Sequence, residues 1–279
     1  MAAAQAACLA ARSILAARRG GALIPWGAPF SSLDVAGALG VQRELRAQCS
    51  AEEETNVGWK CGATGEAIQQ RLGLDGPFFG PLYAGDLLLA PALGFVEHGG
   101  EGGGMQGGLG GTVVGVEAEF TLRLGTAIDL KGREAPATAS SLSTAVEAVI
   151  PSIEVCGTRF EGGLPLPEGA PALIADFAGH SALVLGTARK LAMGNNLQAI
   201  GEVAVELTIN SEKIATGSAA AVLGHPLESL AWLVNALAEE GLHETLPAGA
   251  LIATGATGGQ HPVKPGGERI SYLLFSIFV

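Results

Sequence analysis

The 279-residue chain contains no apolar run that approaches the roughly 18–20 residues needed to cross a membrane as a helix. Cysteine is also scarce, with four residues far apart and neither a CxxC pair nor the Cys/His spacing of a zinc site. These absences argue against a membrane-spanning helix, a disulfide-stapled scaffold and a structural zinc fold. The thiols of Cys8, Cys49, Cys61 and Cys156 are therefore expected to be reduced, in a reducing compartment.

Several motifs with a defined chemistry are missing as well. There is no GxxxxGK[ST] phosphate loop, no Rossmann fingerprint after a strand, no GxSxG elbow and no Ser/His/Asp order. Basic residues are few: 16 Lys and Arg stand against 27 Asp and Glu, for a net charge of −11. This charge argues against nucleic acid or an anionic membrane as a partner. It is compatible with a small anionic substrate, because a local cation or metal ion can override the overall field.

The first 33 residues contain no acidic residue and carry Arg12, Arg18 and Arg19 among many alanines. This composition resembles a mitochondrial transit peptide, and it also fits an ordinary amphipathic helix that ends at Gly20-Gly21. We favour the helix. A cytoplasmic location is therefore expected, with the mitochondrial matrix as the alternative.

Strand patterns dominate the last two-thirds of the chain, and helical patterns dominate its beginning. Helices are predicted over 3–19, over 31–49 with capping serines, and over 226–241 with Pro226 in the first position. Strands are predicted over 113–124, 202–209 and 249–253, and residues 141–160 indicate a helix, a break near Pro151 and a strand. Residues 98–111 include nine glycines among fourteen residues, which predicts a flexible loop or a lid.

The predicted strand VVGVEAEFTLRLG (113–125) carries two glutamates near its middle. Successive strand side chains alternate between faces, so Glu117 and Glu119 should point the same way. Like charges side by side repel and are costly to bury, which leaves two explanations: a solvated strand face, or a bound divalent cation such as Mg²⁺ or Mn²⁺. Glu154, in the apolar segment PSIEVCG, could supply a third carboxylate.

Three further segments allow both a structural and a functional interpretation. Lys60, in GWKCG, is either a solvated turn residue or a lysine that orients an anion or moves a proton beside a metal. His225 precedes the helix at Pro226, where capping is favoured over anion binding. The TGA sequence at 254–256 is predicted to lie in a glycine-rich loop, which is either a plain turn or a site where backbone amides hold a carboxylate.

Six segments occur in an order that resembles one family. They are GWKCGATGEAIQQRLGLDGPFFGPLY, VEAEFTLRLG, VIPSIEVCGTRF, IADFAGHSALVLG, ATGSAAAVLGHPLESLAWLVNALAEEG and IATGA. Together they cover most of residues 10–279. The chain is similar in these segments to the 2-oxopent-4-enoate hydratase/4-oxalocrotonate decarboxylase family of the fumarylacetoacetate hydrolase superfamily.

The resemblance implies an α+β fold, a mixed β-roll of the fumarylacetoacetate hydrolase C-terminal-domain type with a helical N-terminal part. Residues 1–55 would form the helical part, and residues 56–279 would form the β-roll that holds metal and substrate. A homo-oligomer is implied too. The implied site residues are Glu117, Glu119 and Glu154 as ligands of one Mg²⁺ or Mn²⁺, Lys60 as the catalytic lysine, and Asp176, Thr254 and Gly255 as substrate contacts.

The activity that this resemblance implies is that of a divalent-metal-dependent lyase acting on a short 2-oxo or 2-hydroxydienoic acid in aromatic catabolism. Hydration of 2-hydroxypenta-2,4-dienoate is expected first. The alternatives are decarboxylation of a 4-oxalocrotonate-like acid, hydrolysis of an acylpyruvate, and a catalytically inactive member that serves as a structural subunit.

Two positions depart from the family pattern in a way that bears on the reaction. In DGPFFG, Phe78 stands where the hydratases have an acid, and in ADFAGH, Phe177 stands where an asparagine is usual. Both changes replace a polar group by a bulky apolar one near the expected pocket. They bear on water activation more than on metal binding, and so favour an altered substrate, decarboxylation or loss of activity.

Overall fold

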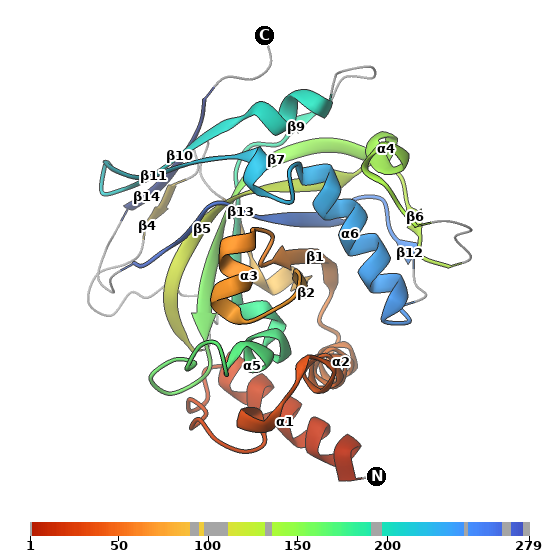
Figure 1. Cartoon of the computed structure of the whole chain (residues 1–279), viewed down its shortest axis with the longest axis vertical. Helices are drawn as coiled ribbons and strands as arrows, with labels where there is room; N and C mark the ends of the chain where they lie inside the picture. Colours follow the sequence, from red (N-terminus) through yellow and green to blue (C-terminus); the bar gives the residue numbers. More distant parts are fainter. Residues whose placement is uncertain are drawn as a thin grey trace.

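In the computed structural model, a curled sheet is flanked by α6, and α1, α2 and α5 gather at one end of the molecule (Figure 1). The structure describes residues 2–89, 95–97, 111–131, 136–190, 197–242, 245–263 and 269–275. The helices are α1 (Ala2–Arg18), α2 (Val35–Ala51), α3 (Glu66–Leu72), α4 (Ala139–Leu142), α5 (Ala170–Ala175) and α6 (Pro226–Glu239). The glycine-rich tract predicted as a loop or lid lies, except for Gly111, outside the described residues.

The strands form a main sheet, a smaller second sheet and one short pair. They are β1 (Asn56–Gly62), β2 (Phe78–Tyr83), β3 (Leu87–Leu89), β4 (Phe95–Glu97), β5 (Thr112–Leu124), β6 (Ile128–Asp129), β7 (Val146–Thr158), β8 (His180–Leu185), β9 (Arg189–Lys190), β10 (Ala204–Ile209), β11 (Glu212–Ser218), β12 (Thr245–Leu246), β13 (Leu251–His261) and β14 (Arg269–Phe275). The main sheet runs β2-β1-β13-β5-β7-β8-β3, and the second runs β11-β10-β14-β4. Because β1–β13 and β3–β8 are parallel and the other pairs of the main sheet are antiparallel, the sheet is mixed.

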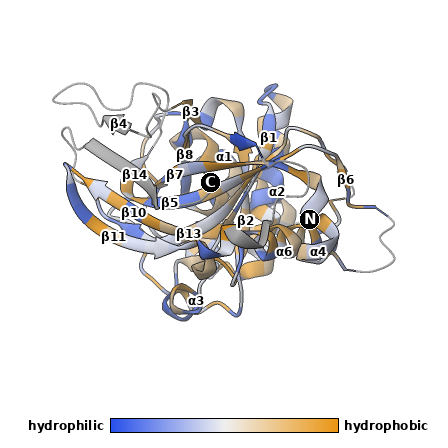
Figure 2. Cartoon of the chain, turned by 90° about the horizontal axis from the view of Figure 1, so that it is seen from above, coloured by the Kyte–Doolittle hydropathy of each residue, from blue (hydrophilic) through white to orange (hydrophobic). Residues whose placement is uncertain are grey.

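One face of the main sheet packs against α6. Alternate residues of β5, including Phe120 and Leu122, share an apolar cluster with Leu230 and Leu233 of the helix. Figure 2 shows α6 coloured largely hydrophobic, as expected for a helix buried along most of its length. Burying this face leaves the other face of β5 and β7 free to carry polar side chains.

The N-terminal helices share a second apolar cluster with later parts of the chain. Leu45 of α2 and Ile14 of α1 belong to the same cluster as Ile174 of α5 and Phe160. The Phe160 ring meets Phe30 edge to face, with 4.9 Å between ring centroids. Contacts of this kind tie residues 1–55 to the sheet. The predicted α+β fold, a mixed sheet with a helical N-terminal part, is confirmed.

Several local predictions were wrong. The helix expected before Pro151 ends by Ala145, and residues from Val146 on belong to β7. The glycine-rich loop expected after residue 253 is a continuation of β13, which extends to His261.

The strand β7 runs through Pro151 without a break. Proline lacks an N–H, but Pro151 lies beside the gap between β8 and β9, where the ladder does not need that donor. Its carbonyl accepts a hydrogen bond from the Gly186 amide at 2.8 Å. The helix α2 is capped by Asp34, whose side chain accepts from the Gly37 amide at 2.7 Å, and not by the serines before it.

Two local predictions are confirmed. The helix α1 ends at Arg18, before the paired glycines. Pro226 is in the first turn of α6, and the His225 side chain accepts a hydrogen bond from the Leu227 amide at 3.0 Å, so His225 is a helix cap. Within the described residues, no helix combines the length and the apolar character needed to cross a bilayer.

We predict that Phe160→Ala lowers the free energy of unfolding by about 3–5 kcal/mol, because it empties a fully buried site between the N-terminal helices and the sheet. Urea unfolding followed by circular dichroism measures this. Leu9→Ala on the exposed side of α1 is the control and should change stability by less than about 0.5 kcal/mol. Equal effects of the two substitutions would contradict the prediction.

The division into residues 1–55 and 56–279 stays a prediction, and the same unfolding curves bear on it. Two separate transitions would show two independently folding parts. A single transition that Phe160→Ala shifts as a whole would show that the helical part and the sheet fold together.

Candidate metal centre

The carboxylates of β5 lie on the face of the sheet that α6 does not cover. Residues 116, 118, 120, 122 and 124 belong to the apolar cluster with α6, so Glu117 and Glu119 point to the opposite side. In the ladder between β5 and β7, Glu117 stands directly opposite Glu154, and Glu119 stands opposite Ser152. The prediction that strand alternation places both glutamates on one face is confirmed.

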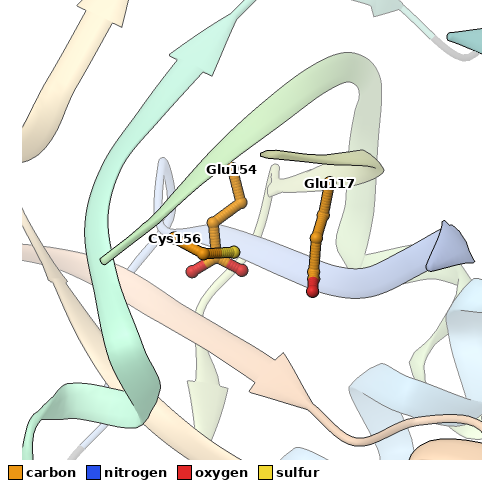
Figure 3. A group of neighbouring side chains, drawn as sticks. All are labelled: Glu117, Glu154 and Cys156. Carbon is orange, nitrogen blue, oxygen red and sulfur yellow. The ribbon is translucent and has the colours of Figure 1, made fainter. Parts of the chain in front are cut away.

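Three side chains of this face come together as potential metal donors. One ligand atom each from Glu117, Glu154 and Cys156 lies within 4.8 Å of the other two. Figure 3 shows the glutamates extending in the same direction from their strands. Glu154 and Cys156 are buried, whereas Glu117 is partly exposed. The structure thus brings two of the three predicted ligands together and adds a thiol; Glu119 lies beside them, outside this group.

Lys60 reaches the same face from β1. Its Nζ lies 2.8 Å from Oε1 of Glu154 and donates a hydrogen bond to Oε2 at 2.9 Å. The ammonium group also donates to the Ala178 carbonyl at 3.1 Å. Since β13 and β5 separate β1 from β7 in the sheet, this contact depends on the curl of the sheet. Lys60 is 3% exposed, so it is not the solvated turn lysine that its local sequence also allowed.

Glu119 is fully buried, and within the described part of the chain no hydrogen bond of ordinary geometry reaches either of its carboxylate oxygens, although the Gly255 amide lies near. Burial, followed by the charges of Glu154 and Glu117, raises the pKa of Glu119 well above its ordinary value, against the opposing effects of Lys60 and the Gly255 amide. Burial and Glu154 likewise raise the pKa of Glu117 to about 7. Uncompensated buried carboxylates are rare, so this face favours either bound protons or a bound cation.

Glu154 differs from its neighbours because it has positive partners. Burial alone would raise the pKa of Glu154, but Lys60 and His180 bring it below the ordinary value. Burial alone would lower the pKa of Lys60, but the surrounding acidic groups, Glu154 foremost, raise it above the ordinary value. Glu154 and Lys60 are therefore an ion pair at neutral pH.

This donor set fits a hard divalent cation. Among the described residues of the face, three carboxylates stand against one ammonium group, which leaves excess negative charge in a buried place. Mg²⁺ and Mn²⁺ prefer carboxylate oxygens, and an ion here would meet the unpartnered oxygens of Glu119.

His180 is a site residue that sequence reasoning missed. Its Nδ1 is 2.9 Å from Oε1 of Glu154, so the imidazole and Lys60 hold the same carboxylate. The other ring nitrogen, Nε2, is buried and has no hydrogen-bond partner in the described parts of the chain. The only sequence signal was the histidine that ends ADFAGH. Its link to Glu154 comes from the β7–β8 register, where His180 pairs with Cys156.

Comparison with known proteins supports this picture. No model of a known protein family matches the chain. The chain is 32% identical over 215 residues to 2-keto-4-pentenoate hydratase of Paraburkholderia xenovorans, covering 75% of this chain and 69% of that protein. It is 29% identical over 237 residues to 4-oxalocrotonate decarboxylase of a Pseudomonas species, covering 85% and 81%. The chain belongs to the 2-keto-4-pentenoate (2-oxopent-4-enoate) hydratase/4-oxalocrotonate decarboxylase family.

Solved structures agree with the family assignment. 4-Oxalocrotonate decarboxylase from Pseudomonas putida G7, complexed with magnesium and adipate, superposes with a TM-score of 0.76 at 26% identity, covering 96% of this chain and 94% of that one. Fumarylpyruvate hydrolase from Pseudomonas aeruginosa shares the fold, with a TM-score of 0.55 at 15% identity, covering 77% and 83%. The fold is that of the fumarylacetoacetate hydrolase superfamily.

The carboxylate of Asp176, predicted to contact substrate, pairs with two arginine side chains. Its Oδ2 accepts a hydrogen bond from Nε of Arg159 at 2.6 Å, and its Oδ1 lies 3.4 Å from Arg18. Arg18 also donates to the His180 carbonyl at 2.7 Å. Arg18 thus links the N-terminal helix to Asp176 and to the start of β8, and the role of Asp176 toward a substrate stays a prediction.

The predicted contacts on β13 lie next to the glutamate face. The hydroxyl of Thr254 donates to the Phe120 carbonyl at 2.9 Å, so it is used within the sheet. Gly255 has a φ of +111°, and a Cβ there would lie 2.3 Å from Oγ1 of Thr64, so the position requires glycine. The Gly255 amide lies near Glu119. Substrate binding by Thr254 and Gly255 stays a prediction.

Both phenylalanines that depart from the family pattern lie near Lys60. Phe78 packs against Gly62, where a Cβ would come within 2.2 Å of its ring. Phe177 stacks against Tyr83 with 5.6 Å between ring centroids, and it precedes Ala178, the carbonyl partner of Lys60. Phe177 and Ala178 have φ values of +48° and +59°, a left-handed conformation that is costly for such residues. The packing of Phe177 therefore helps to hold the Lys60 anchor.

We predict that the metal-free protein loses stability as the pH rises from about 5 to about 8. The folded-state pKa of Glu117, about 7, exceeds the ordinary value of 4.5, and that of Glu119 is also raised. Their proton-linked stabilisation is complete at low pH and is lost as the pH rises through those values. Glu119→Gln should raise the unfolding free energy at about pH 8 by about 1–3 kcal/mol and reduce the pH slope.

Chemical unfolding across this pH range, with chelator present, measures both effects. Glu212→Gln, at an exposed position of β11, is the matched control and should follow the unsubstituted protein. A Glu119→Gln variant less stable than that control at high pH would show that the Glu119 charge is compensated in the metal-free protein.

Proposed function

We propose that the protein is a divalent-metal-dependent lyase acting on a short 2-oxo or 2-hydroxydienoic acid, with hydration of 2-hydroxypenta-2,4-dienoate as its first reaction. The observation that carries this proposal is the buried face on which Glu117 meets Glu154, Glu119 has unpartnered oxygens, and Lys60 contacts Glu154. The names of the family members support it, as does the magnesium in the solved decarboxylase.

The carboxylates of Glu117, Glu119 and Glu154 would hold the Mg²⁺ or Mn²⁺ ion. An ion of this kind supplies Lewis-acid stabilisation of the negative charge on the C2 oxygen of a 2-oxo acid. The three carboxylates provide the charge that attracts the cation. Because the face is largely buried, bulk water is excluded and each electrostatic interaction there is stronger than at the surface.

Lys60 is the residue that we propose moves a proton, at its Nζ atom. Its raised pKa keeps the ammonium group protonated at neutral pH, so it acts as an acid or orients a substrate carboxylate. Hydration requires protonation of the dienol carbon chain as it becomes a ketone. Decarboxylation requires protonation of the enolate that forms when CO₂ leaves. A single ammonium group anchored by Glu154 and Ala178 can serve either step.

Decarboxylation of a 4-oxalocrotonate-like acid is the second candidate reaction. The superposition with 4-oxalocrotonate decarboxylase, which extends over 96% of the chain, favours it. So do Phe78 and Phe177, which are buried apolar residues at positions where the hydratases have polar groups, because loss of CO₂ needs no activated water and hydration does. Acylpyruvate hydrolysis, or a structural role without catalysis, would give metal binding without turnover of these two acids.

A homo-oligomer in the cytoplasm completes the proposal. The oligomer is supported by the family resemblance, and the reducing compartment by the scattered free thiols. The strongly acidic composition supports a small molecule, and neither nucleic acid nor membrane, as the partner.

We predict that the Mn²⁺-loaded protein consumes 2-hydroxypenta-2,4-dienoate, followed by the loss of its ultraviolet absorbance. Lys60→Met should lower kcat by about 10²–10⁴-fold, the usual contribution of a positioned proton donor. The same variant should bind Mn²⁺ at least as tightly, because a competing cation has been removed from Glu154. Free Mn²⁺ is measured by electron paramagnetic resonance.

Lys190→Met, at an exposed position of β9, is the matched control and should keep both properties. Parallel reactions with 4-oxalocrotonate, scored by CO₂ release, separate decarboxylation from hydration. Full activity in Lys60→Met would remove Lys60 from the mechanism, and undiminished turnover in excess chelator would contradict metal dependence.

A further inference from the structure

The carboxylate face contains a thiol that neither proposed reaction uses. The sulfur of Cys156 lies within 4.8 Å of ligand atoms of Glu117 and Glu154 (Figure 3). The other buried cysteines are placed differently: Cys49 lies in the apolar cluster of the N-terminal helices, and Cys61 lies in the cluster with α6. Among these buried thiols, Cys156 is thus the one whose sulfur is grouped with ligand atoms of Glu117 and Glu154.

The position of Cys156 follows from the sheet. It is two residues after Glu154 on β7, so both side chains point to the same side. Its neighbour on β5 is Gly115, which has no side chain to cover the sulfur, and its neighbour on β8 is His180. Burial and Glu154 raise the pKa of Glu117, and the nearby thiol of Cys156, like Lys60, acts in the opposite direction. Strand pairing therefore holds the sulfur in the same place as the two carboxylates.

A second observation shows that the face is built for a ligand. Both oxygens of Glu119 are buried and have no hydrogen-bond partner among the residues that the structure describes, and Glu119 is on the same face of β5 as Glu117. A fully buried carboxylate of this kind is normally satisfied by a hydrogen bond or an ion. The sulfur of Cys156 thus lies on a face where carboxylate oxygens still lack a hydrogen-bond donor or a cation among the described residues.

We infer that Cys156 is a sulfur ligand of the metal ion, alongside Glu117 and Glu154, and that the centre accepts thiophilic divalent ions such as Zn²⁺, Co²⁺ and Cd²⁺ in addition to Mg²⁺ and Mn²⁺. This inference rests on the proposed metal centre and concerns its selectivity. Ligation breaks the S–H bond, forms a metal–sulfur bond and releases the proton to the solvent, with no change of oxidation state.

The physical consequence is a mixed donor set. Carboxylate oxygens suit Mg²⁺ and Mn²⁺, whereas thiolate strongly favours softer ions. A centre with carboxylates alone would bind Cd²⁺ without any sulfur signature. A centre that includes Cys156 binds Cd²⁺ and Co²⁺ with a sulfur-to-metal charge-transfer band in the ultraviolet.

The test is a titration of the full-length metal-free protein with CdCl₂ and CoCl₂. The unsubstituted protein should develop the charge-transfer band at a stoichiometry of one ion per chain. Cys156→Ser and Cys156→Ala should lose the band, release about one proton fewer per Cd²⁺ bound, and bind Cd²⁺ at least about tenfold more weakly. Mn²⁺ affinity should change by less than about threefold, since oxygen ligands dominate its binding.

Cys49→Ser is the matched control, a buried thiol remote from the face, and it should keep the band. X-ray absorption at the cadmium edge of the unsubstituted protein should show a sulfur neighbour, a measurement that needs no folded variant. Cd²⁺ binding without the band, or a band that persists in both Cys156 variants, overturns the inference and leaves the carboxylate centre standing. Absence of binding by both Mn²⁺ and Cd²⁺ overturns the inference and the proposed function together.

Discussion

Burial of negative charge on one face of the β5–β7 pair is the constraint on which the rest of the site depends. The opposite face packs against α6, so these strands are held in the interior and their carboxylates cannot be solvated freely. The buried charge of Glu154 is compensated by Lys60 and His180, which both contact its carboxylate. That of Glu119 is not, because its oxygens have no hydrogen-bond partner among the described residues. A bound cation would resolve the imbalance, and the curl of the sheet brings Lys60 of β1 to Glu154 of β7 on the same face.

The parts of the molecule that the sequence predicts well are those governed by short-range periodicity. Strand alternation was enough to place Glu117 and Glu119 on one face, and Pro226 marked the start of α6. The break expected at Pro151 is absent. Proline usually interrupts a strand, but Pro151 occupies a position where the pairing with neighbouring strands needs no N–H donor. The resemblance of six ordered segments supplied the overall fold, which periodicity alone could not.

Contacts between distant strands could not be predicted in this way. Cys156 and His180 enter the site through the register of β7 with its neighbours, which no spacing in the sequence reveals. For Phe177 the sequence shows an unusual residue but not its structural role. Its departure from the family pattern was visible, but its role was not: it packs against Tyr83 and precedes the carbonyl that anchors Lys60. Residues that differ from relatives thus form the surroundings of the lysine rather than replacing it.

The most direct test of the central claim is the anomalous-difference density of crystals grown with MnCl₂. One strong peak is expected on the carboxylate face of β5 and β7, within ligand distance of carboxylate oxygens of Glu117 and Glu154 and beside Glu119. An empty face that keeps the Lys60–Glu154 ion pair at saturating Mn²⁺, or a peak elsewhere in the fold, would contradict the central claim.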